Sequence, residues 1–162
     1  MSLAEFWNWL GGLSISMRIG ESWWFPLLES IHVLASTFVV GSILMVDLRL
    51  LGVTARQHRV SRITREMLVW TRSAFFLSAI AGLGMFITQP ARYADNRAFQ
   101  IKMVLLVLAG LNMAVFHLRT IRGVEQWDTD PVVPVPARLA GACSIVLWIG
   151  IVLAGRWIGH LL

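Results

Sequence analysis

Long apolar stretches, separated by short charged segments, dominate the hydropathy pattern of this chain. Four stretches of 16 to 19 residues contain no Asp, Glu, Lys or Arg: 30–46, 73–91, 103–118 and 139–155. A helix rises 1.5 Å per residue, so roughly 20 residues cross the hydrocarbon, with flanking charges at its edges. The pattern predicts an all-α, polytopic membrane protein with four transmembrane helices in a bundle. The expected spans are about 25–51, 68–89, 99–119 and 138–158.

Composition supports a membrane domain with little sequence left for anything else. The 162 residues are 57% hydrophobic and 14% charged, whereas soluble domains have about 25% charged residues. We therefore expect residues 1–162 to form a single integral membrane domain. The lone cysteine, Cys143, excludes an internal disulfide and a cysteine cluster.

The N-terminal segment predicts a short helix at the membrane surface. Residues 3–10 place Trp7 and Trp9 beside other apolar side chains, as an interfacial helix would. The segment lacks a basic beginning and carries Glu5 early, so we expect no cleavable signal peptide.

The basic residues divide unevenly between the two sides of the predicted membrane. Nine lie in or beside the two connections that join spans one to two and three to four, and five lie on the other side. The positive-inside rule then places both termini outside, in the periplasm if the membrane is a bacterial cytoplasmic (inner) membrane. The net charge of +5 is thus a topology signal and does not indicate nucleic-acid binding.

Small residues in the spans and prolines in one connection carry further structural signals. Thr37/Gly41, Ser78/Gly82 and Gly155/Gly159 follow the small-xxx-small pattern, which allows close helix approach within the bundle or against a partner chain. The proline-rich connection 123–136 predicts an ordered or partner-bound loop.

The ionisable residues inside the spans form two predicted layers. With spans one and three running in the same direction, His32 and Lys102 should lie at similar depth near the outer face. Fifteen residues later in each helix come Asp47 and His117, about 22 Å deeper at helical rise. We expect these two residues to lie close together near the inner face, because an unpaired acid is costly there. Such residues are rare in hydrocarbon and usually face protein, water or a cofactor.

The outer layer contains candidate ligands. Glu29 and His32 are three residues apart and share a helix face, continued by Ser36. A di-iron bundle repeats the Glu-x-x-His pair on two helices, whereas this chain has it once. Haem b needs only one or two axial ligands at matching depth.

His32 is therefore the first candidate haem or metal ligand, with Lys102 or a second histidine opposite it and Glu29 beside it. His117, with Met113 one turn away, is a second candidate for haem or metal at the inner layer. His58 and His160 are expected to be solvated. A purely structural role is the alternative, in which His32 hydrogen-bonds a neighbouring helix and Glu29 and Lys102 pair or reach the interface.

Two spans also carry a family resemblance. The stretch 29–52, ESIHVLASTFVVGSILMVDLRLLG, resembles the first span of HemJ-type protoporphyrinogen oxidases and of CopD-like membrane domains, with its early histidine and its polar pair at the inner end. The stretch 100–117, QIKMVLLVLAGLNMAVFH, resembles their later span with a lysine. The resemblance implies His32 as a haem ligand and Lys102 as its functional partner.

The chain departs from the oxidase pattern after the histidine. Phe38 stands where a tryptophan is expected, and Asp47-Leu48-Arg49 replaces a Pro-Arg step. The whole chain also resembles a group of small four-span bacterial membrane proteins without an assigned function.

Three hypotheses follow. The first is a haem-binding or redox-associated membrane subunit that passes electrons near the outer face to a quinone or a partner membrane protein. The second is a non-catalytic structural or accessory subunit of a larger complex, or a homo-oligomer, embedded in the lipid bilayer. The third is a copper transport protein, which the absence of a Met- or Cys-rich pathway disfavours. Whether the protein is an enzyme stays open.

Overall fold

The computed structural model describes residues 2–54, 59–120, 128 and 133–161, and it confirms the predicted all-α membrane fold. Four of the described helices are long and apolar enough to cross a membrane: α3 (Trp24–Leu50), α4 (Val60–Phe86), α6 (Arg97–Val115) and α7 (Val135–Leu161). A π-helical turn, η1 (Phe116–Thr120), continues α6. The described residues contain no strand.

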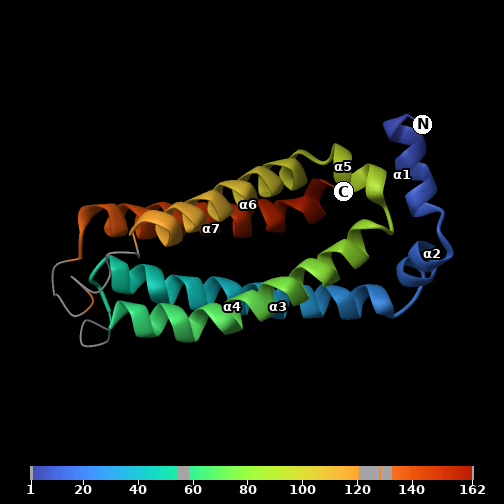
Figure 1. Ribbon diagram of the computed structural model, residues 1–162. Coiled ribbons are helices and arrows are strands. Elements are labelled where there is room, and N and C mark those ends of the chain that lie inside the picture. The colour runs from blue at the N-terminus through green and yellow to red at the C-terminus, as the bar shows by residue number, and fades with distance from the viewer. Residues whose placement is uncertain (1, 55–58, 121–127, 129–132, 162) are drawn as a thin grey trace.

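The four spans form two antiparallel hairpins, α3/α4 and α6/α7, laid along each other (Figure 1). Within each hairpin the helices pack closely, and the hairpins meet mainly through α3 and α7, whereas the backbones of α4 and α6 stay further apart. Both chain termini lie at one end of the bundle, which we call the terminal end. The end of α3, the start of α4, the turn η1 and the start of α7 lie at the opposite end, which we call the connection end (Figure 1).

The helix boundaries differ most from prediction at the connection end. Helix α4 begins at Val60 instead of residue 68, and it carries Arg62 and Arg65 in its first turns. Charged residues can continue a helix beyond the hydrocarbon, because the backbone bonds stay satisfied and the side chains reach the headgroups. At 27 residues, α4 spans about 40 Å, close to the full bilayer with its headgroups.

Three short helices cover the terminal end: α1 (Leu3–Gly11), α2 (Ser14–Gly20) and α5 (Pro90–Asp95). The predicted N-terminal helix is confirmed as α1, and Ser2 and Glu5 cap it reciprocally, with Ser2 N–H donating to Glu5 at 2.8 Å. Neither α2 nor α5 was predicted from the sequence. Pro90 starts α5 at a position where the missing N–H costs nothing.

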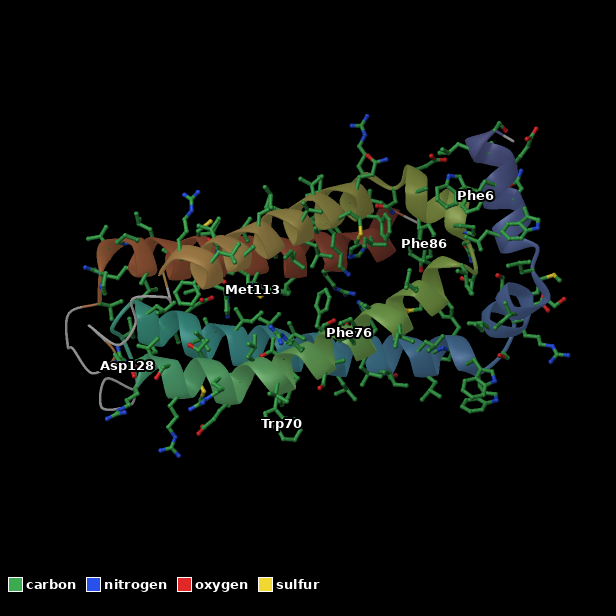
Figure 2. The ribbon with its side chains drawn as sticks, viewed as in Figure 1. Phe6, Trp70, Phe76, Phe86, Met113 and Asp128 are labelled. Carbon is green, nitrogen blue, oxygen red and sulfur yellow. The ribbon has the colours of Figure 1, made fainter. Side chains whose placement is uncertain are left out.

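Aromatic side chains pack two of these short helices, α1 and α5, against the spans. Phe86 lies at the centre, with its ring 5.6 Å from Trp7, 6.0 Å from Tyr93 and 5.5 Å from Phe99. Figure 2 shows Phe86 and Phe6 at this end of the molecule. One cluster thus joins α1, α4, α5 and α6 where the spans emerge.

At the connection end, a single residue of the α6–α7 connection caps α4. The carboxylate of Asp128 accepts hydrogen bonds from the Ser61 N–H at 2.8 Å and from the Ser61 hydroxyl at 2.6 Å. The Val60 N–H also points to the Asp128 carbonyl at 3.4 Å. Most of the predicted loop 123–136, and His58 in the other connection, lie outside the described residues.

The same contacts set the charge state of Asp128. Partial burial opposes ionisation, but the two Ser61 hydrogen bonds and the charges of Arg59 and Arg49 outweigh it and hold the pKa of Asp128 below its ordinary value. An ionised carboxylate at a helix N-terminus satisfies free N–H groups and complements the helix dipole.

We predict that Asp128→Ala destabilises the protein by about 1 kcal/mol, the usual cost of losing a helix cap. The cap of the wild type should hold above about pH 4 and weaken as the pH falls through the lowered pKa, because only the carboxylate accepts both bonds. Thermal unfolding in mild detergent measures both effects. Asp95→Ala, at an exposed acid of α5, is the control, and an equal loss there would contradict the cap.

Candidate functional site

His32 is held in one orientation by α4. Its Nδ1 lies 2.7 Å from the Ser78 carbonyl oxygen and 3.1 Å from the Ser78 hydroxyl. A carbonyl can only accept, so Nδ1 carries the proton and Nε2 keeps its lone pair. The Ser36 hydroxyl, one turn along α3, lies 2.7 Å from the Ser78 hydroxyl. The polar contact between α3 and α4 therefore fixes both the tautomer and the ring.

Lys102 approaches the free nitrogen of this imidazole from the other hairpin. Its Nζ on α6 lies 3.5 Å from His32 Nε2, a long hydrogen bond in which the ammonium donates. A side chain at Gly155 on α7 would stand within 3.7 Å of Nζ. All four spans thus meet at the His32–Lys102 pair, which confirms that the two residues lie at the same depth.

Gly82 leaves the space that the imidazole occupies. A Cβ at this position would lie 3.1 Å from His32 Cε1 and 3.2 Å from Nδ1, closer than ordinary contact. Ser78 and Gly82 form one of the predicted small-residue pairs. In the structure the serine supplies the hydrogen bonds and the glycine supplies the room, so the pair builds the histidine site.

Glu29 does not complete this cluster. Its side chain is exposed, and the hydrogen-bond partner of His32 Nδ1 is Ser78. Burial raises the pKa of Tyr93, and the negative charge of Glu29 raises it further, which places the carboxylate near the phenol of α5. Glu29 therefore lies at the rim of the site, toward the terminal end.

The second predicted layer does not come together as a pair. Asp47 is buried, is hydrogen-bonded to Ser144 of α7, and sits where Gly141 allows close approach: a Cβ there would lie 3.2 Å from the Asp47 carbonyl oxygen. The residue of α6 that reaches this level is Asn112, whose amide donates to the Ala140 carbonyl at 3.0 Å.

His117 comes five residues after Asn112, about 7.5 Å further along α6. Its Nδ1–H donates to the Met113 carbonyl at 3.0 Å, and its Nε2 is buried without a hydrogen-bond partner in the described structure. Neither a hydrogen bond nor an ion pair joins it to Asp47 among the described residues. His117 therefore has one ring nitrogen that could act as a ligand, and the described structure does not show the predicted pairing of Asp47 with His117.

The chemistry available at the His32–Lys102 pair is narrow. It offers an imidazole lone pair whose direction is fixed by a backbone carbonyl, which is the usual arrangement of a metal-binding histidine. Beside it stands an ammonium that can donate protons or neutralise negative charge. In the part of the chain that the structure describes, no three His, Cys, Asp or Glu side chains gather as a metal site, so a bare metal ion would lack ligands.

We predict that Gly82→Val disturbs the site, because the added side chain must displace the His32 ring. Overpacking of this kind costs typically 1–3 kcal/mol. Gly41→Val is the matched control, since a Cβ at Gly41 of α3 meets nothing within 4 Å. Thermal unfolding in detergent should show a larger loss for Gly82→Val, and equal losses would contradict the close contact.

Comparison with known proteins identifies the chain by family. No curated protein and no solved structure matches it, so these comparisons lend no support to the resemblance to HemJ-type oxidases or CopD-like domains. One family model covers residues 15–161, which includes all four spans and every residue of the site. The chain belongs to this family, a family of unknown function designated DUF6644.

Proposed function

We propose that the protein is a small redox-associated membrane subunit in which His32 is an axial ligand of haem b. The observation that carries this proposal is the Nδ1–H···O=C bond from His32 to Ser78 at 2.7 Å. It fixes the imidazole within a span and turns the Nε2 lone pair toward the junction of the four helices. A Nδ1–H bond to a backbone carbonyl is the usual arrangement of a histidine whose Nε2 acts as a ligand.

The donor set fits haem b better than it fits a bare metal ion. The porphyrin of haem already supplies four equatorial nitrogens, so the protein needs to supply only axial ligands and an apolar setting. His32 supplies one ligand, and Lys102 is the candidate for a second one if its amine is neutral. His117, fifteen residues further along the α6 span, is a candidate only for a separate site in the deeper layer. When bound, haem would supply one-electron chemistry. The chain supplies the fixed imidazole, a low dielectric and, through the Ser78 carbonyl, a more basic ligand.

Lys102 places a positive charge beside the imidazole of His32. Its Nζ lies 3.5 Å from His32 Nε2, and the described part of the structure contains no ion pair from an acid to this lysine. A positive charge in low dielectric stabilises added negative charge nearby. An ammonium here therefore favours the reduced form of a redox centre or binds the oxygen of a quinone.

The orientation that we propose places both termini and the His32–Lys102 pair toward the outside. Nine basic residues flank the connection end against five at the terminal end. In a bacterial cytoplasmic membrane, electrons would then be handled near the periplasmic face.

An accessory role in a larger complex is the second proposal, and one observation favours it. Thr37 and Gly41 form a small-residue pair on an exposed face of α3, and a Cβ at Gly41 would meet nothing within 4 Å. Such pairs are typical of close helix packing. Among the described residues, no helix covers the pair, so a partner membrane protein or a second copy would pack there.

The absorption spectrum of protein expressed with ample haem tests the redox proposal. We expect a Soret band that shifts on reduction with dithionite, is lost in His32→Ala and persists in His160→Ala, whose histidine is exposed near the C-terminus. Size-exclusion chromatography must show that the His32→Ala protein stays folded. A wild-type protein without Soret absorption would refute haem binding and favour the accessory role.

Cysteine labelling in intact cells tests the orientation. In a Cys143→Ala background, Asp95→Cys at the terminal end should react with an impermeant maleimide, and Thr54→Cys at the connection end should not. Both positions are exposed in the structure. The reverse pattern would overturn the orientation without affecting the His32 site.

A further inference from the structure

A buried acid near the connection end has no cation beside it in the described structure. Asp47 of α3 is 5% exposed, and the Ser144 hydroxyl of α7 donates a hydrogen bond to its carboxylate. The second carboxylate oxygen, Oδ2, is buried and has no hydrogen-bond partner among the described residues. Burying a carboxylate is costly unless a donor or a positive charge compensates it. A further group is therefore needed at Oδ2.

The place of Asp47 along α3 increases this cost. Asp47 lies three residues before Leu50, the last residue of the helix. The carbonyl groups at a helix C-terminus give that end a partial negative charge, which disfavours an anion and favours a cation. The backbone around Asp47 thus adds to the need for a positive ligand.

Arg49, the nearest basic residue in the sequence, serves a different acid. Two residues along an α-helix correspond to a rotation of about 200°, so Asp47 and Arg49 leave α3 on opposite faces. The Asp47 side chain reaches Ser144 of α7, whereas the charge of Arg49 acts on Asp128, the residue that caps α4. Arg49 therefore belongs to the Asp128 cap and not to the surroundings of Asp47.

The residues of α7 and α6 beside Asp47 offer oxygen atoms to a ligand but no charge. Helix α7 meets Asp47 through Gly141 and Ser144, and α6 reaches this level with the amide of Asn112. His117 lies further along the α6 span and has no hydrogen bond to Asp47 in the described structure. Neither helix therefore supplies the missing positive charge.

Helix α4 does not supply it either. The Ser42 hydroxyl of α3 lies 2.7 Å from that of Thr71 on α4. Because the two helices are antiparallel, Asp47, five residues further along α3, is level with Glu66 of α4, which is exposed and pairs with Arg62 at 2.8 Å. Exposed charges are screened by water and salt. The other basic residues near this level are also exposed: Arg65, Arg72, Arg119 and Arg138.

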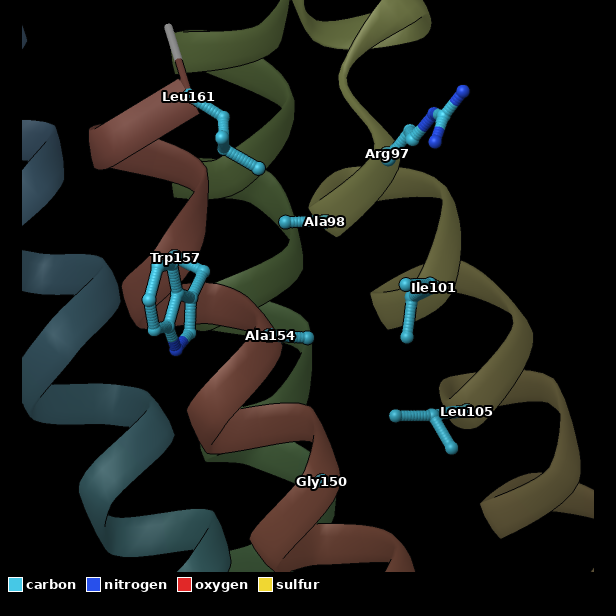
Figure 3. A pocket seen from close by; sticks show the side chains of 8 residues that line it. All are labelled: Arg97, Ala98, Ile101, Leu105, Gly150, Ala154, Trp157 and Leu161. Atoms are coloured by element: carbon cyan, nitrogen blue, oxygen red, sulfur yellow. The ribbon is translucent and has the colours of Figure 1, made fainter.

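The α6/α7 hairpin holds the Ser144 hydroxyl in a fixed place. Leu105 of α6 points toward α7, and Ala154 of α7 points toward α6 (Figure 3). The two helices are so close that a Cβ at Gly150 would lie 3.0 Å from Leu105 Cδ1. Ser144 comes six residues before Gly150 on the same helix. The oxygen that accompanies Asp47 is thus carried by a helix whose position is set by packing.

We propose that Asp47 binds a small monovalent cation, a proton or Na⁺, with Ser144 as the neighbouring oxygen. Either ion supplies the positive charge that the buried carboxylate lacks. Ionisable residues within membrane spans commonly mark ion pathways and proton relays. Because Asp47 lies in the last turn of α3, the ion exchanges with the solution at the connection end. The site does not depend on haem binding at His32.

Thermal unfolding in mild detergent tests this site, since a ligand that binds the folded protein raises its Tm by mass action. One series varies the pH from about 5 to about 9 without Na⁺, and a second replaces N-methylglucamine by Na⁺ at about pH 9. A bound proton predicts a Tm that falls as the pH rises and does not respond to Na⁺. Bound Na⁺ predicts a rise in Tm of roughly 3–6 °C at about ten times its Kd.

Asp47→Asn keeps the shape of the side chain and removes its charge, so it should abolish whichever dependence the wild type shows. The comparison also separates Asp47 from the histidines, whose titration continues in the variant. Asp95→Asn, at an exposed acid of α5, is the matched control and should keep the wild-type dependence. Responses to pH and Na⁺ that are the same in Asp47→Asn as in the wild type would overturn the proposal.

Ser144→Ala decides the question if Asp47→Asn does not fold. It retains the acid and removes the hydroxyl that contacts it, so the midpoint of the pH or Na⁺ dependence should move. Ser73→Ala is its control, because Ser73 is exposed and donates to the Val69 carbonyl of its own helix. A midpoint that stays the same in both serine variants would also contradict the site.

Discussion

Hydrocarbon cannot solvate a proton donor or acceptor, so a polar side chain in these spans is favoured only where the protein, a bound group or water supplies a partner. The consequence is clearest at His32. Its Nδ1 is satisfied by Ser78 of α4, and its Nε2 faces the ammonium of Lys102 from α6. Each contact crosses a helix boundary, and the second one crosses between hairpins that otherwise meet mainly through α3 and α7. The pair therefore ties together two halves that apolar packing alone joins weakly.

Apolar burial contributes little to this bundle, because the lipid is as apolar as the side chains it would cover. In the most apolar window of each span, only 11–22% of residues are buried. Close approach and single hydrogen bonds hold the helices instead. Gly82 admits the His32 ring, Gly141 brings α7 against Asp47, and Asn112 and Asn96 fasten α6 to α7. Substitutions at these points should matter more than changes of one aliphatic residue for another.

Sequence patterns predicted the four spans because hydropathy and the absence of charge are properties of single helices. They also predicted the common depth of His32 and Lys102, which follows from helical rise. They failed where the answer depends on how helices tilt and rotate. The equal spacing of fifteen residues suggested that Asp47 would meet His117, but α6 reaches the level of Asp47 with Asn112. Likewise, helix spacing placed Glu29 beside His32, while the rotation of α3 turned the imidazole toward Ser78. Of the α4 contacts that hold the imidazole, only the pair Ser78/Gly82 was visible in the sequence, as a small-residue pattern.

The two polar layers now differ in a way that bears on function. In the layer of His32, both ring nitrogens face partners within the chain: Nδ1 donates to Ser78, and the lone pair of Nε2 points at the Lys102 ammonium. The deeper layer keeps unsatisfied atoms, since Asp47 Oδ2 and His117 Nε2 are buried without a hydrogen-bond partner in the described structure. Buried polar atoms of this kind are normally satisfied by water or by a neighbouring group. A site that positions a cofactor needs ligands held in one orientation, and the hydrogen bond to Ser78 holds His32 in this way. This difference is why we assign ligand chemistry to His32 and treat His117 as the second candidate.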